Sequence, residues 1–177
     1  MKYLKYISVL VLTIMLTSCS SEKSIQQLYV DSETNDDYLM FDIPMSIMEL
    51  PDSATLKAKQ AYESVNKVNL LVFKINELNK DNYKVEKDKV KKIIKNPKYQ
   101  ELMRVNNNGY KIIAKYIGSD ESIEELILFA SDNKKGFGLA RVLGDDMKPE
   151  NMIVLLDQIN NIDQESEIFN QLEGFFK

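Results

Sequence analysis

The sequence contains no histidine and no tryptophan, and it contains a single cysteine. The lack of histidine excludes a Ser-His-Asp triad, a Cys-His pair, proton transfer by imidazole and histidine-containing zinc sites. A single cysteine cannot form an intramolecular disulfide, so the core must stabilise the fold. Any bound metal would have to be a hard cation held by carboxylates, and we expect no cofactor.

The first 18 residues have the pattern of a bacterial export signal. Lys2 and Lys5 precede an uncharged apolar run at residues 6–16, which is shorter than the roughly 20 residues of a permanent membrane span. The sequence Leu16-Thr17-Ser18-Cys19 resembles the bacterial lipobox. This resemblance implies cleavage after Ser18, a thioether-linked lipid on Cys19 and acylation of the new amino group. An uncleaved N-terminal helix is the alternative.

Composition predicts one acidic domain behind this anchor. Cleavage removes two lysines, leaving 21 basic and 27 acidic residues, so the net charge falls from −4 to −6. An acidic chain is a poor general binder of nucleic acid, and we expect no nucleic-acid partner. We assign residues 1–18 to the signal peptide, 19–37 to a tether from the lipidated cysteine, and 38–177 to one domain.

Hydrophobic periodicity places strands and helices in that domain. Strand-like runs at 99–105, 110–117, 123–130 and 137–143 are separated by short turns, one of them Asn108-Gly109, which indicates an antiparallel meander. The other expected elements are strands at 38–43 and 68–75, helices at 54–66, 83–96 and 149–160, and a short helix capped by Ser24. Asp52 or Ser53 can cap the helix at 54–66. The apolar side of the helix at 83–96 is made of Tyr83, Val90, Ile93 and Ile94, and that of the helix at 149–160 is made of Met152, Ile153, Leu156 and Ile159.

We therefore expect an α+β fold. Its sheet would be mixed and mainly antiparallel, made of two N-terminal strands plus the four-strand meander, with helices packed mainly on one face. If the first two strands pair in parallel, their crossover should be right-handed.

Two stretches resemble a known family. They are Phe41-Asp42-Ile43-Pro44 followed by Ser46-Ile47, and the run from Arg141 to Met147. Both are similar to small Bacteroidota lipoproteins known as domain of unknown function 4252, over roughly residues 25–160. The resemblance implies a source group, an envelope location and a loose association with sigma-factor genes, and it carries no established activity or site.

Acidic pairs are the candidates for chemistry. Asp145 and Asp146, before the helix at 149–160, are weak candidates for a metal or acid–base site. The interpretation we favour is that an aspartate there caps the helix. Asp120 and Glu121 are interpreted as turn residues. We assign no catalytic residue and no metal ligand, and Cys19 is the one expected site of modification.

Three other features each have two interpretations. Lys84, Lys87, Lys91 and Lys95 share one helical face, which is either solvated, as we favour, or in contact with anionic lipid or an acidic partner. The amphipathic segment 163–176, with Phe169, Leu172, Phe175 and Phe176, either covers the sheet or binds a partner. Asp42 and Arg141 lie on strands and could pair.

These features predict a lipid-anchored cell-envelope protein that binds an envelope protein or peptide and has no enzymatic activity. A carboxylate-based hydrolase, metal-assisted or acting on glycans, is one alternative, and an envelope-stress signalling component is another. The residues after Cys19 contain one glutamate, a weak match to the acidic run of surface lipoproteins. We therefore expect the outer membrane, with the domain facing the periplasm.

Overall fold

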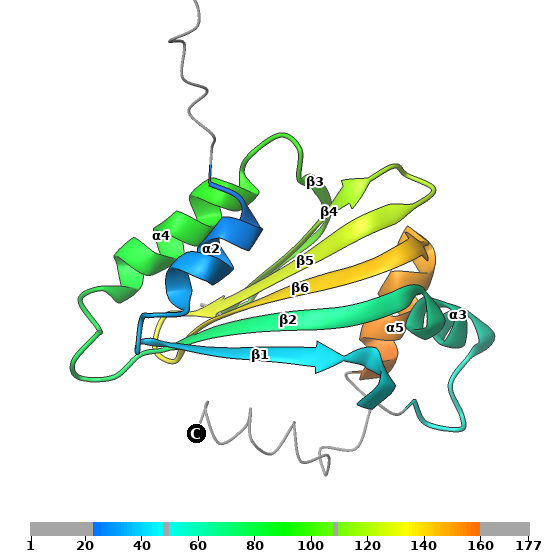
Figure 1. The fold of residues 1–177 in the computed structure, drawn as a ribbon, viewed down its shortest axis with the longest axis horizontal. Coiled ribbons are helices and arrows are strands. Elements are labelled where there is room, and N and C mark those ends of the chain that lie inside the picture. The colour runs from blue at the N-terminus through cyan, green and yellow to red at the C-terminus, as the bar shows by residue number, and fades with distance from the viewer. Residues whose placement is uncertain (1–22, 48–49, 108–109, 160–177) are drawn as a thin grey trace, which may run out of the picture.

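A computed structural model describes residues 23–47, 50–107 and 110–159, and the expected signal, Cys19 and segment 163–176 lie outside them. The described chain forms one six-stranded sheet with four α-helices and a short 3-10 helix (Figure 1). The strands are β1 (Tyr38–Pro44), β2 (Val65–Lys74), β3 (Gln100–Asn107), β4 (Tyr110–Gly118), β5 (Ile123–Asp132) and β6 (Gly136–Met147). The helices are α2 (Ile25–Ser32), η1 (Met45–Ile47), α3 (Leu56–Ser64), α4 (Tyr83–Ile94) and α5 (Pro149–Ile159).

The sheet confirms the α+β class and the meander. Its strand order is β1-β2-β6-β5-β4-β3, so β3 to β6 are consecutive neighbours. Every pair is antiparallel, including β1 with β2, so the described sheet is not mixed. The connection explains this, because α3 is nine residues long and leads directly into Val65, the first residue of β2. A helix of that length spans about 14 Å, too little to return along a strand of about 23 Å for a parallel crossover.

Helices cover both faces of the sheet, where we expected mainly one. Helices α2 and α4 pack on one face over Leu71, Phe73 and Leu139, and α3 and α5 pack on the other over Leu126 and Val142. Successive strand residues point to opposite faces, and both sets are apolar here, so each face needs cover. Figure 1 shows the two helix pairs at opposite ends of the sheet. On each face of the sheet, therefore, the helices cover one end and leave the other end uncovered by them.

The stretch expected to be a tether belongs largely to the fold. Ser24 caps α2 as expected, since its side chain accepts from Gln27 N at 3.1 Å. Ile25, Leu28 and Tyr29 are buried against α4 and the sheet. The sequence analysis expected this short helix but assigned it to the tether, whereas in the structure it packs on the core of the domain. The first helix among the described residues begins at Ile25, six positions after Cys19.

Three details of the helices also differ from expectation. The cap of α3 is Thr55, whose side chain accepts from Ala58 N, and not Asp52 or Ser53. Helix α4 buries the expected face, made of Tyr83, Val90, Ile93 and Ile94. In the part of α5 whose burial is described, Asn151, Met152 and Leu155 are buried, whereas Ile153 is 44% exposed and was wrongly placed in the apolar face.

Aromatic rings fill the core beneath α2 and α4. Phe73 and Phe137 stack with centroids 5.4 Å apart, and Tyr83 packs beside both. Tyr83 Oη donates to Asp132 O at 2.7 Å. Burial, with a smaller contribution from Asp132, raises the pKa of Tyr83 from 10.0 to about 12. We therefore expect a high pH to destabilise this part of the core.

Stability should fall as the pH rises above 10, and Tyr83→Phe should reduce the fall. Between pH 10 and 12 the unfolded chain loses the Tyr83 proton before the folded chain does, so ionisation favours unfolding by up to about 2–3 kcal/mol. At pH 8 the variant should be less stable than the parent, because it lacks the hydrogen bond to Asp132. Urea unfolding at several pH values should show this gap shrinking towards pH 12, and a constant gap would contradict the assignment.

Candidate functional site

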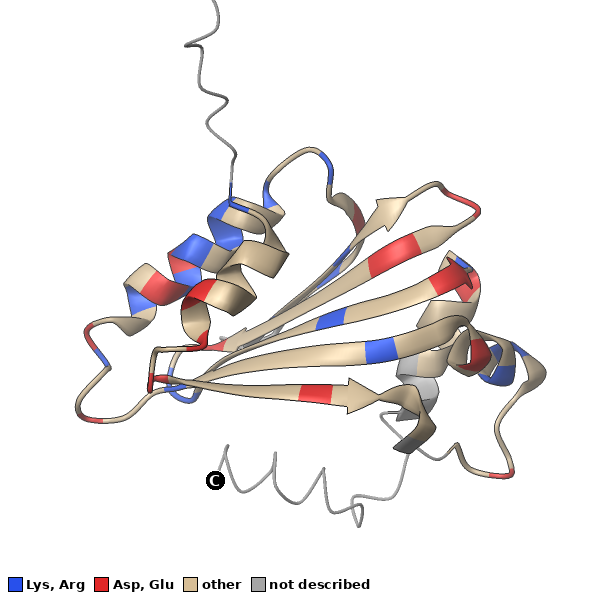
Figure 2. Ribbon diagram, viewed as in Figure 1, with Lys and Arg blue, Asp and Glu red and all other residues tan. Residues whose placement is uncertain are grey.

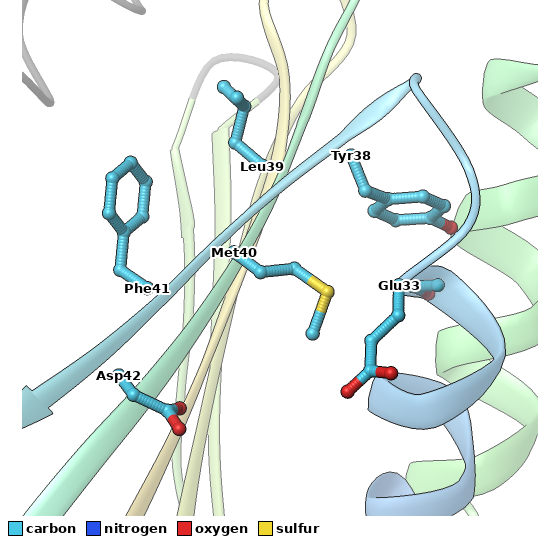
Figure 3. A pocket seen from close by; sticks show the side chains of 7 residues that line it. Glu33, Tyr38, Leu39, Met40, Phe41 and Asp42 are labelled. Carbon is cyan, nitrogen blue, oxygen red and sulfur yellow. The ribbon is translucent and has the colours of Figure 1, made fainter.

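A surface hollow of about 490 Å³ lies at the free edge of β1, beside the end of α2. Figure 3 shows Glu33, Met40 and Asp42 directed into the space between β1 and α2, with Leu39 and Phe41 on the opposite face of the sheet. The hollow exists because β1 ends the sheet and α2 packs above its first residues. The hollow is therefore lined by an edge strand, apolar side chains and two carboxylates.

The backbone of β1 is part of this site. Tyr38 N donates to Asn35 O at 3.0 Å, so its amide points away from β2. In an antiparallel strand alternate residues direct their backbone groups to the same side. Met40 and Asp42 consequently direct their N–H and C=O groups to the outer edge of the sheet. Sequence reasoning did not single out Glu33 or Met40, because no local pattern marks an edge strand.

A polar row crosses the sheet next to the hollow. Asn69 on β2 is buried, donates to Asp42 and lies opposite both Asp42 and Arg141 in the strand register. Asp42 and Arg141 are thus separated by β2 and do not pair. Arg141 Nη2 instead donates to Glu125 Oε2 at 2.9 Å.

Tyr29 of α2 contacts the backbone beside this row. Its hydroxyl lies 2.7 Å from Asn69 O and 2.8 Å from Leu139 O. Burial raises the pKa of Tyr29, and the nearby Arg141 partly offsets this. The hydroxyl stays protonated at neutral pH and donates to the backbone, so this part of the row is structural.

The other acidic candidates lie at the opposite end of the sheet. Asp145 and Asp146 are inside β6, and Lys148 is the residue directly before α5, so neither aspartate caps that helix as expected. Asp145 accepts from Asn66 and Asp146 from Ser122, so the two carboxylates are engaged by different partners. Asp120 accepts from Tyr116 Oη at 2.7 Å, which raises the pKa of that tyrosine.

A second hollow, of about 420 Å³, lies on the face that α3 and α5 cover only at one end. Its floor is made by small residues of β5 and β6, namely Ala130, Gly138 and Ala140, beside Leu70 and Val72 of β2. A Cβ added at Gly138 would meet nothing within 4 Å. The lining is mostly apolar, but it also includes Ser131, Asp132 and Lys135. Asp132 accepts hydrogen bonds from the backbone amides of Lys134 and Lys135, so its carboxylate is engaged by the turn before β6.

The chemistry available to the described residues is limited. In residues 23–47, 50–107 and 110–159, no three His, Cys, Asp or Glu side chains gather in a way that could hold a metal ion. None of the helices in these ranges is long and apolar enough to cross a membrane. The β1 edge, with its hollow and its outward-facing backbone groups, is the best candidate site among the described residues.

Comparison with known proteins gives one result. The profile of the family described as Domain of unknown function (DUF4252) matches residues 29–155. No curated protein and no solved structure matches the chain. The matched region runs from within α2 into α5 and contains all six strands. The chain therefore belongs to the DUF4252 family.

Proposed function

We propose that this protein is a non-enzymatic interaction module of the cell envelope, anchored by lipid on Cys19 at the periplasmic face of the outer membrane. The lipobox supports the anchor. The observation that carries the binding role is the hollow at the free edge of β1. The two features together describe a domain that presents a sheet edge close to a membrane.

The occupant is an extended peptide segment of another envelope protein. An edge strand presents alternate N–H and C=O groups, which an added strand can satisfy by main-chain hydrogen bonds. Side chains of the added strand would alternate between the hollow beside Met40 and the opposite face beside Leu39 and Phe41. Pro44 ends β1, so the available edge is short.

Charge determines which peptide fits. Glu33 and Asp42 are both exposed, and their carboxylates lie on the same side of β1 (Figure 3). A lysine or arginine on the added strand would lie between them, whereas an acidic residue would be repelled. We therefore infer a partner segment in which apolar and basic residues alternate.

Two short peptides test this proposal on the mature chain carrying Cys19→Ala. One alternates valine with lysine, and the other alternates valine with glutamate. The lysine peptide should bind, and hydrogen exchange should slow at the amides of Met40 and Asp42. Glu33→Gln with Asp42→Asn should weaken binding roughly two- to thirtyfold, since each exposed ion pair contributes about 0.2–1 kcal/mol.

Glu121→Gln is the matched control, because Glu121 is an exposed carboxylate in the turn between β4 and β5. It should leave the affinity unchanged. Equal binding of the two peptides would contradict the role of the carboxylates. Binding without protection of the β1 amides would contradict strand addition.

A further inference from the structure

Helix α4 and the turn after it carry a concentrated positive charge in an acidic protein. Residues 83–98 contain seven lysines and two acidic residues, a net charge of +5, whereas the whole chain has −4. Figure 2 shows these lysines along α4 and at its end nearest the start of α2. Such separation of charge calls for a physical explanation.

The acidic side chains of α4 do little to neutralise its outer face. Glu86 is 12% exposed and accepts from Tyr38 Oη at 2.8 Å and Lys89 Nζ at 2.6 Å, so it points towards the core. Asp88 is exposed and lies 3.8 Å from Lys91. Among the described residues, Lys92 and Lys95 are exposed and have no ion-pair partner.

The same end of α4 lies where the anchor enters the domain. Ile25 N donates to Tyr99 Oη at 3.3 Å, so the start of α2 lies beside the turn that follows α4. Lys98 Nζ lies 4.7 Å from the centre of the Tyr99 ring. Five residues, 20–24, separate Cys19 from α2, so Cys19 and Ile25 can lie at most about 22 Å apart.

We infer that the basic face of α4, with Lys98, contacts anionic lipid head groups of the membrane that holds the anchor. This rests on the lipid anchor in the proposed function. The short linker holds these lysines near the bilayer. Anionic head groups attract lysines that come within the screening length of about 8 Å. The domain is then oriented with α4 towards the membrane and α3 and α5, at the other end of the sheet, away from it (Figure 1).

Position-specific quenching on vesicles tests this orientation. The lipidated full-length mature protein is reconstituted in phosphatidylcholine vesicles with and without phosphatidylglycerol. A fluorophore is attached to Val85→Cys on α4 or to Leu56→Cys on α3, whose parent side chains are 56% and 73% exposed. With Cys19 capped as a thioether, only the introduced thiol reacts.

Phosphatidylglycerol should reduce acrylamide quenching of the label at position 85 and leave that at position 56 unchanged. Lys92→Glu with Lys95→Glu should abolish the reduction, as should high salt, whereas arginine at both positions should preserve it. Equal quenching of position 85 in both vesicles would overturn the inference while leaving the anchor intact. Mass spectrometry of Cys19 and vesicle flotation report the anchor separately, and an unlipidated Cys19 would overturn both.

Discussion

Gly136→Ala should be among the most damaging single substitutions in this protein. Gly136 starts β6 with φ of 133°, a conformation open essentially to glycine alone. A Cβ there would lie 1.9 Å from Phe73 O and 3.2 Å from Lys74 Cα, both of which are backbone atoms of β2. Since β2 is a central strand, it cannot move aside without disturbing its pairing with β1. We expect the free energy of unfolding to fall by about 3 kcal/mol or more, measured by urea unfolding of the mature chain with Cys19→Ala.

Gly138→Ala is the control, two residues along the same strand. Its Cβ would meet no atom within 4 Å, and its φ is not in the positive region. Alanine should change stability little or increase it by about 0.4–1 kcal/mol, because it restricts the unfolded chain. Equal losses at positions 136 and 138 would show that the local backbone geometry is not the cause.

Arg141→Met should also destabilise the fold strongly. Arg141 and Glu125 form an ion pair of 2.9 Å with side chains only 17% and 12% exposed. Arg141 Nε and Glu125 Oε1 already lack hydrogen-bond partners among the described residues. Removal of the arginine would leave a buried carboxylate without its counter-ion, which typically costs about 3–5 kcal/mol.

A double-mutant cycle separates pairing from packing. Arg141→Met with Glu125→Leu should recover most or all of the lost stability, because the unpaired charge is then absent. The matched surface pair is Glu101–Arg104, 2.6 Å long, whose side chains are 43% and 46% exposed. Arg104→Met should cost no more than about 1 kcal/mol. An Arg141→Met loss as small as that of Arg104→Met would refute the importance of the buried pair.

Local patterns in the sequence predicted local structure well. The buried face of α4 followed from the spacing of Tyr83, Val90, Ile93 and Ile94, since a helix places such residues on one side. The meander followed from short turns between apolar runs, since such turns allow only antiparallel neighbours. The cap of α2 was also predicted, but its burial was not, because propensity does not report what an element packs against.

The polar row beside the candidate site was beyond prediction for a related reason. Asp42, Asn69, Arg141 and Glu125 come from four strands, and β2 and β6 are far apart in the chain although they are neighbours in the sheet. Asp42 and Arg141 were therefore named correctly as strand residues but not as neighbours of Asn69. Similarly, an aspartate at 145 or 146 was predicted to cap the following helix, but both residues belong to β6.

The sequence by itself determined the features that depend on nearby residues, namely the absence of histidine, the buried face of α4 and the order of the meander. The export signal and the lipid site stay predictions from the sequence. Tertiary structure alone decided that β1 lies at the edge, that helices cover both faces, and that the lysine-rich end of α4 lies beside the start of α2. The physical reason is that strand order and helix docking minimise exposed apolar surface over the whole chain, a balance that no short segment contains.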